Sequence, residues 1–304
     1  MFERNEQIGF SRHSERAEGS LGYGASEHER PSEKYPSLTI EGEEKARELA
    51  KGDFAEMLEN SAKDAILFIG GSSEEDRTKA TAEIIGDELA KKYRDDETVV
   101  ILSKSDIGNI RENVKDKSSV LQEIKKLIDS NKDKKLVFTF PLFLKEFSLR
   151  PHHREKETGE HTPYMKELLE TTADADGQYQ ELEAAKEWFR NEGKIEKDGE
   201  TLQVPSPQKT AENHIVGINR LKKFAKKFTG ARELNIGFVG HGWQLDALAV
   251  YLANEGKVNS ESFEKLFGSE IMEQPESGRV EISENKATFF YRGRKYKTPD
   301  ELLR

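Results

Sequence analysis

The sequence predicts a three-layer α/β/α sandwich, with a mostly parallel central sheet between two layers of helices. Short apolar segments bounded by polar turns alternate with longer segments of helical periodicity, which is typical of layered α/β domains. The short segments are almost continuously apolar, as strands are when helices cover both faces of a parallel sheet. The 304 residues are 34% hydrophobic and 35% charged, so the chain can bury a core beneath a densely charged surface.

The alternating segments give a consistent order of elements. Short apolar runs predict strands over residues 7–10, 65–69, 98–102, 136–140 and 235–239. Helical periodicity predicts helices over residues 40–58, 75–93, 119–130 and 210–228. In the last of these, Thr210 is the expected N-cap, and one apolar stripe comprises Ile215, Ile218, Leu221, Phe224 and Phe228. Two runs near the end, 279–283 and 287–291, predict a C-terminal β-hairpin.

Two regions depart from this alternation. Residues 16–37 are rich in Gly, Ser, Pro and charge, so we expect a long loop there. Residues 146–208 carry two amphipathic segments, 162–171 and 180–191, but no strong strand and few apolar residues. We therefore expect a single domain comprising residues 1–304, with residues 146–208 as an inserted helical cap that packs on it.

Composition and charge exclude several functional classes. A net charge of −10 argues against bulk nucleic-acid binding, which needs many Lys and Arg contacts to phosphates. The absence of cysteine excludes a disulfide framework and a thiolate nucleophile, and it suits a reducing compartment. The first residues lack the apolar stretch of a signal peptide, and no run reaches the roughly 18 apolar residues of a membrane span. We expect a cytoplasmic protein with no membrane or nucleic-acid partner, and its oligomeric state stays open.

Two arginines and two histidines follow the predicted strands. Arg12 and His13 come after the first strand, Arg77 follows the second, and His241 follows the last, between two glycines. The carboxyl ends of parallel strands meet at one edge of the sheet, where open α/β folds bind ligands. We expect a cationic pocket there, and a phosphate dianion fits it, helped by backbone N–H groups at helix N-termini. This recognition needs no metal, and the sequence has no GxxxxGK[ST] phosphate loop.

Four elements in this order resemble the histidine phosphatase superfamily, also called phosphoglycerate mutase-like. Where the family has Arg-His-Gly after its first strand, this chain has Arg12-His13-Ser14-Glu15. The other three are Leu38-Thr39-Ile40-Glu41-Gly42, then Ser72-Ser73 with Arg77 and Thr81-Ala82, and His241-Gly242 before the helical segment Leu245-Leu252. The chain departs from the pattern at Ser14, where the family has Gly, and in a Ser-rich turn without its usual Pro. The resemblance covers nearly the whole chain apart from the insertion and the tail.

The resemblance implies a function and a set of roles. His13 would be the nucleophile that becomes phosphorylated, and Arg12, Arg77 and His241 would stabilise the phosphoryl oxygens. We expect phosphate or substrate contacts from Ser14, Glu15 and Arg16. The activity implied is metal-independent, cofactor-free hydrolysis of a small phosphorylated metabolite through a phosphohistidine. Two alternatives are phosphoryl transfer of the phosphoglycerate mutase type and a catalytically inactive module that binds phosphorylated ligands.

The general acid is the role that the resemblance leaves open. Many members place a Glu in the loop after the third strand, and others place an Asp directly after the second His. Gly242-Trp243 excludes the second arrangement. Of Glu112, Asp106 and Glu146 we favour Glu112 and keep the other two open.

Three further patterns have ordinary explanations. His152, His153 and His161 lie among acidic residues, but their spacing matches no standard metal site, so we expect a solvated loop. Residues 172–183 imitate an EF-hand loop with Thr172 in place of the first ligand, and we interpret them as a turn. The basic run 292–295 is expected on the surface of the C-terminal hairpin. No metal site is predicted.

Overall fold

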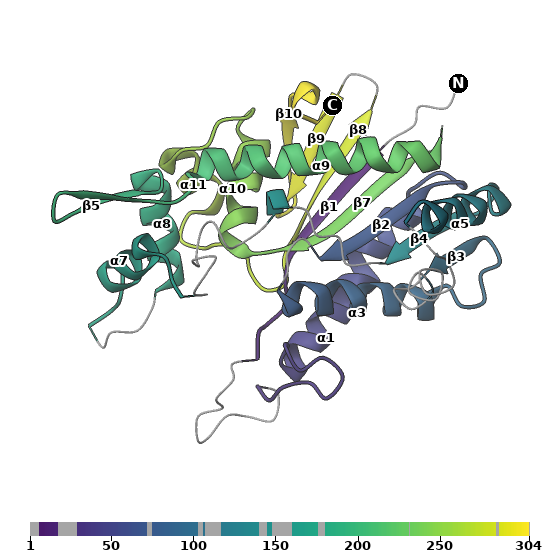
Figure 1. The fold of residues 1–304 in the computed structure, drawn as a ribbon, viewed down its shortest axis with the longest axis horizontal. Helices are drawn as coiled ribbons and strands as arrows, with labels where there is room; N and C mark the ends of the chain where they lie inside the picture. Colours follow the sequence, from purple (N-terminus) through teal and green to yellow (C-terminus); the bar gives the residue numbers. More distant parts are fainter. Residues whose placement is uncertain are drawn as a thin grey trace.

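An eight-stranded sheet forms the centre of the molecule, which we describe from a computed structural model (Figure 1). The structure describes residues 6–17, 29–71, 75–102, 106, 117–139, 145–147, 160–175, 180–230, 232–283 and 286–303. The strand order is β10-β9-β8-β1-β7-β2-β4-β3. The strands are β1 (Glu6–Arg12), β2 (Ile66–Gly71), β3 (Val99–Leu102), β4 (Lys135–Thr139), β7 (Leu234–Gly240), β8 (Ser277–Ser283), β9 (Lys286–Tyr291) and β10 (Arg294–Thr298).

The parallel part of the sheet consists of β1, β7, β2, β4 and β3, which match the five predicted strands. Their apolar side chains are almost all buried along β1, β2 and β7, as expected of strands covered on both faces. β1 and β2 both pair with β7, with Arg12 opposite Gly240 and Gly71 opposite Val239. The carboxyl ends of these three strands therefore lie side by side.

Helices cover both faces of the sheet, as the sequence predicts. One layer contains α1 (Ile40–Leu49), a π-helical turn η1 (Ala50–Phe54), α2 (Ala55–Glu59) and α3 (Asp76–Lys92). The other contains α5 (Lys117–Ser130), α9 (Pro207–Thr229), α10 (Gly242–Ala253) and α11 (Ser260–Phe267), with short 3₁₀ turns η2 (Lys145–Phe147) and η3 (Asp300–Leu303). Figure 1 shows α1 and α3 on one side of the sheet and α9 on the other. In the described part of the chain, no helix has both the length and the apolar character of a membrane span.

Several helix details differ from the prediction. The helix expected at Thr210 begins at Pro207, because the Ser206 hydroxyl accepts the N–H of Lys209 and Pro suits the first helical position. Phe224 is 45% exposed and so does not belong to the buried stripe. The helix expected over residues 40–58 is interrupted by the π-helical turn η1. Periodicity alone cannot locate such a turn.

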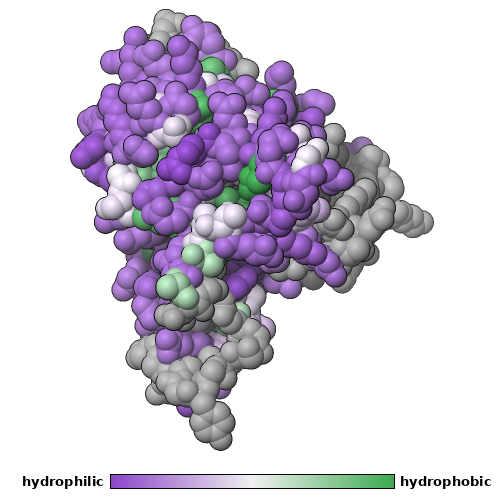
Figure 2. Space-filling view, turned by 90° about the vertical axis from the view of Figure 1, so that its left-hand side faces the viewer, coloured by the Kyte–Doolittle hydropathy of each residue, from purple (hydrophilic) through white to green (hydrophobic). Residues whose placement is uncertain are grey.

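The inserted region contains α7 (Pro163–Thr171), α8 (Glu181–Asn191) and an antiparallel pair, β5 (Lys194–Lys197) and β6 (Glu200–Gln203). The sequence predicts no strong strand in this region, and the two strands that form are short, with four residues each. Asp198 and Gly199 both have positive φ, which suits a two-residue hairpin turn, but the strands are mostly exposed and polar. Buried Trp188 stacks on Trp243 of α10, with ring centroids 6.1 Å apart. The side of the molecule that carries this region is mostly hydrophilic (Figure 2).

The C-terminal strands extend the sheet in antiparallel fashion beyond β1. β8 pairs with β1, and β8 and β9 form the predicted hairpin. A third strand, β10, pairs with β9 after a turn at Arg292 and Gly293, which both have positive φ. The basic run 292–295 thus forms a turn and the start of a charged edge strand.

Candidate active site

The adjacent ends of β1, β7 and β2 bring His13, His241 and Arg77 together. His13 follows β1, His241 follows β7, and Arg77 lies in the first turn of α3, which follows β2. The two imidazole rings lie edge to face with centroids 5.2 Å apart. Both histidines are buried, being 5% and 4% exposed. The strand-end argument from the sequence therefore places these residues correctly in space.

His13 is held in one tautomer. Its Nδ1 lies 2.7 Å from the carbonyl oxygen of Ser14, which can only accept, so Nδ1 carries the proton. The Nε–H of Arg77 donates to His13 Nε2 over 3.1 Å, so Nε2 bears the lone pair. Burial and the nearby Arg77 charge lower the pKa of His13 well below its usual 6.5. At neutral pH the ring is uncharged, with its nucleophilic nitrogen beside a guanidinium.

Arg77 connects the two histidines. Its Nη2 lies 3.4 Å from Nδ1 of His241, while its Nη1 donates to the carboxylate of Glu75 over 3.2 Å. The side chain is mostly buried, at 16% exposure. Its contacts fix the planar guanidinium between the imidazoles, where it can meet a tetrahedral oxyanion.

Arg12 lies against the start of α10. Its Nη1 donates to the carbonyl of Met272 over 2.7 Å, and its Nη2 donates to Oε1 of Glu181 over 2.6 Å. Its Nε is buried without a hydrogen-bond partner among the described residues. A Cβ on Gly242 would lie 2.8 Å from the guanidinium carbon of Arg12. The glycine after the second histidine therefore makes room for this arginine.

The other family-like residues hold the His13 loop in place. The backbone N–H of Ser14 donates to Thr81 Oγ1 over 3.1 Å, and Thr81 in turn donates to the carbonyl of Arg77 over 2.9 Å. The Ser14 hydroxyl donates to the carbonyl of Gly42 over 2.6 Å. A Cβ on Gly42 would lie 2.5 Å from the Glu15 carbonyl. The elements at residues 12–15, 38–42 and 77–82 thus form one hydrogen-bonded unit.

Two other predicted substrate contacts lie at its margin. The Glu15 carboxylate is 3.7 Å from the ammonium group of Lys45. Arg16 is exposed and forms a backbone bridge with Leu38. A substrate role for Ser14, Glu15 or Arg16 stays a prediction.

The three acids named from the sequence have different standings in the structure. Glu112 lies outside the described residues, as do Ser72 and Ser73 of the Ser-rich turn. Asp106 is described and exposed. Glu146 forms an ion pair with Arg220 of α9. Of the other patterns noted in the sequence, His152, His153 and residues 176–179 of the EF-hand-like loop also lie outside the described residues.

Two carboxylates that sequence reasoning missed lie beside Arg12. Glu181, the first residue of α8, pairs with its guanidinium. Asp246 in α10 is fully buried and accepts the N–H of Met272 over 3.1 Å. Burial raises the pKa of Asp246 to about 8, and the charge of Arg12 opposes this rise. The sequence does contain a signal for Asp246, since it is the one charged residue in the mostly apolar segment GWQLDALAVYLA. Nothing in the sequence around Glu181 points to Arg12.

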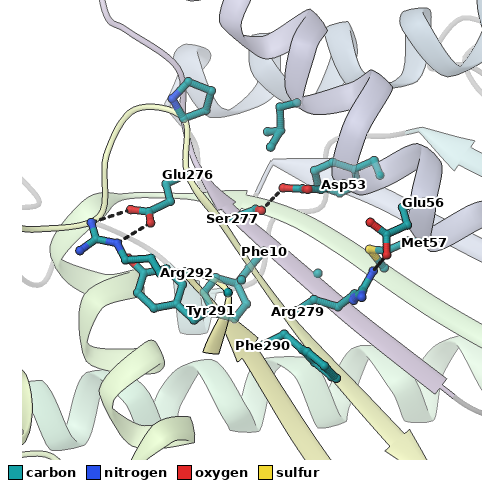
Figure 3. A pocket seen from close by; sticks show the side chains of 16 residues that line it. Phe10, Asp53, Glu56, Met57, Glu276, Ser277, Arg279, Phe290, Tyr291 and Arg292 are labelled. Carbon is teal, nitrogen blue, oxygen red and sulfur yellow. Dashed lines mark hydrogen bonds and ion pairs between the residues drawn. The ribbon is translucent and has the colours of Figure 1, made fainter. Parts of the chain in front are cut away.

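Two cavities lie beside β1, one at its last residue, Arg12, and the other at Gly9 and Phe10. One, of about 560 Å³, is lined by Arg12, Glu15 and Glu181 together with Glu41, Lys45, Leu182 and residues 269–274. The other, of about 520 Å³, lies between the π-helical turn with α2 and the β8–β9 strands (Figure 3). Arg279 of β8 pairs across it with Glu56 of α2 over 3.0 Å, and Arg292 pairs with Glu276 over 2.6 Å at the β8–β9 side. Neither His13 nor His241 lines either cavity.

Comparisons with known proteins give similarities of fold. No protein-family model matches this sequence, and no curated protein matches it either. Among solved structures, two mycobacterial hydrolases are similar, each 12% identical with a TM-score of 0.40. The first comparison covers 97% of this chain and 89% of the hydrolase. The second covers 91% of this chain and 92% of the hydrolase. A mycobacterial glucosyl-3-phosphoglycerate phosphatase is 12% identical over 90% of this chain and 89% of its own, with a TM-score of 0.39. Such similarities do not assign an activity, so the function has to be argued from the side chains.

Proposed function

We propose that this protein hydrolyses phosphomonoesters through a phosphohistidine on His13, without a metal ion, and that its substrate is a small phosphorylated metabolite of the cytoplasm. The observation that carries the proposal is the state of His13. The ring is buried and neutral, and its Nδ1–H is directed at the Ser14 carbonyl. Its Nε2 lies 3.1 Å from a guanidinium nitrogen. A nucleophilic nitrogen next to fixed positive charge is what in-line phosphoryl transfer requires.

The reaction needs two displacements at phosphorus. In the first, the Arg77 N–H exchanges its hydrogen bond to His13 Nε2 for one to a phosphoryl oxygen, which frees the Nε2 lone pair. That lone pair then forms a bond to phosphorus, the ester P–O bond breaks, and its electron pair stays on the leaving oxygen, which takes up a proton. In the second, water attacks the phosphohistidine and the N–P bond breaks, which releases phosphate and regenerates the neutral imidazole. Arg77, Arg12 and His241 would stabilise the negative oxygens in both steps, by charge-assisted hydrogen bonds.

The sequence resemblance to the histidine phosphatase superfamily supports the same chemistry. Parts of all four elements that carry the resemblance lie within the described residues, and they converge on His13. His13 and Arg77 contact each other directly, and Arg12 packs on the glycine that follows His241. Residues that are far apart in the chain thus form one cationic cluster in a protein whose net charge is −10.

The test is hydrolysis of p-nitrophenyl phosphate in the presence of EDTA. We expect turnover by the wild-type protein and its loss in His13→Ala, together with an acid-labile phosphoenzyme in the wild type only. His161→Ala is the control, since His161 is partly exposed in the inserted region. Phosphate binding without turnover would contradict the proposal and favour a binding module. Transfer of the phosphoryl group to a second phosphorylated alcohol instead of water would favour the mutase alternative.

A further inference from the structure

The Glu181 carboxylate lies directly at Arg12, a residue that we expect to bind the phosphate. Its Oε1 accepts a hydrogen bond from Nη2 of Arg12 over 2.6 Å. The Arg12 side chain is 6% exposed, whereas that of Glu181 is 39% exposed and so remains in contact with solvent. Glu181 begins α8, which is anchored by the buried Trp188 and Phe189. This carboxylate is therefore fixed at its base and open to a ligand at its tip.

The space beside this pair suits a leaving group. The cavity of about 560 Å³ is lined by both Arg12 and Glu181. Arg12 ends β1 directly before His13, so it connects this cavity to the two histidines, which do not themselves line it. The cavity walls come from α1, from α8 and from residues 269–274. They leave room for an organic group attached to the phosphate.

A phosphoryl group bound by Arg12 would share this guanidinium with the Glu181 carboxyl group. Sharing one guanidinium would bring the carboxyl group next to the phosphoryl group and its ester oxygen. A carboxylic acid held at the ester oxygen is what the departing alkoxide needs.

We propose that Glu181, from the inserted region, is the general acid of the phosphatase reaction. The inference rests on the function proposed above. In the first displacement, the P–O bond breaks toward oxygen while that oxygen takes the Glu181 proton, so an alcohol leaves. In the second, the Glu181 carboxylate takes a proton from the attacking water as the water oxygen bonds to phosphorus. One proton is given and one is regained, so the enzyme returns to its starting state.

Leaving groups of graded basicity test this assignment. p-Nitrophenolate leaves readily without a proton, whereas phenolate and above all an alkoxide do not. We expect Glu181→Gln to hydrolyse p-nitrophenyl phosphate at a rate within about fivefold of wild type. With ethyl phosphate its kcat should fall by about 10²–10⁴-fold, the usual contribution of an acid catalyst. Phenyl phosphate should give an intermediate loss, and Glu181→Asp, which keeps the acid, should recover part of the activity.

Glu183→Gln is the matched control, because Glu183 lies on the same helix, is 57% exposed and pairs with Lys186. Glu183→Gln should leave the hydrolysis rates of p-nitrophenyl, phenyl and ethyl phosphate unchanged. An equal effect of Glu181→Gln on all three esters, or no effect, would overturn the assignment of the acid while leaving His13-dependent turnover intact. Cleavage of only the nitrophenyl ester by the wild-type protein would also overturn the assignment of Glu181 as the acid. Absence of turnover by the wild-type protein, or turnover that survives His13→Ala, would instead contradict the proposed function itself.

Discussion

Gly242 has no room for a side chain because the guanidinium of Arg12 packs against it. A Cβ there would lie 2.8 Å from Cζ and 3.0 Å from Nε of Arg12. Gly242→Ala favours helix formation at the start of α10 but displaces Arg12 from its place beside the proposed phosphate site. We expect kcat/KM for p-nitrophenyl phosphate to fall at least about tenfold, since shifts of about 1 Å in a positioned group have such costs. Gly52→Ala is the control, and an unchanged kcat/KM in Gly242→Ala would show that Arg12 does not act on the substrate.

The sequence predicts individual site residues when their position follows from a strand. His13 and His241 directly follow buried apolar runs, so their convergence follows from the parallel sheet. The Arg12–Glu181 pair joins residues 169 positions apart, across the boundary of the inserted region. Hydrophobic patterning contains no information on that contact, because it depends on how α8 packs against α10. The family resemblance instead predicts an acid in the loop after β3.

Among the elements, α3 is held on the sheet by an unusually close approach to β4. A Cβ on Gly86 would lie 2.3 Å from the Thr139 hydroxyl oxygen and 2.8 Å from Thr139 Cβ. We expect Gly86→Ala to lower the free energy of unfolding by about 1–3 kcal/mol, because overpacking outweighs the better helix propensity of Ala. Urea denaturation measures this change, and loss of activity should accompany it because α3 carries Arg77.

Gly52 is the matched comparison for this variant. It lies in the π-helical turn with nothing within 4 Å of its Cβ position. Gly52→Ala should leave stability unchanged or raise it by about 0.5–1 kcal/mol, through lower entropy of the unfolded chain. Equal effects of the two substitutions would mean that the α3–β4 contact is looser than the structure shows.

The hydrophobic pattern predicts helices and strands where it is strong, and it fails to predict strands where it is weak. The five central strands and the flanking helices are apolar on the faces that they bury. β5 and β6 have mostly exposed side chains, so only the Asp198-Gly199 turn indicates a hairpin. β10 pairs on one side only and is largely charged, as edge strands are. Its basic residues therefore predict an exposed surface run, and hydrophobic patterning does not identify the strand.

At the scale of the whole molecule, buried titratable groups make the free energy of unfolding depend on pH. Burial lowers the pKa of His214 to about 4, and His13 is also shifted well below 6.5. The unfolded chain then binds more protons than the native state below pH 6.5, so stability falls as the solution becomes acidic. Asp246 acts in the opposite sense, since its native pKa of about 8 exceeds its unfolded value near 4. The native state holds the extra proton between these values, so its contribution falls as pH rises.

Below about pH 6.5 the histidines act against Asp246. Between about 6.5 and 8, Asp246 acts alone among these three groups. Each pH unit in that range costs about 1.4 kcal/mol, so the free energy of unfolding should fall by about 2 kcal/mol. Asp246→Asn keeps an oxygen for the Met272 N–H but cannot ionise. Its unfolding free energy, measured with urea from pH 5 to 9, should lack the alkaline decrease, and curves parallel to wild type would show that Asp246 is already ionised at neutral pH.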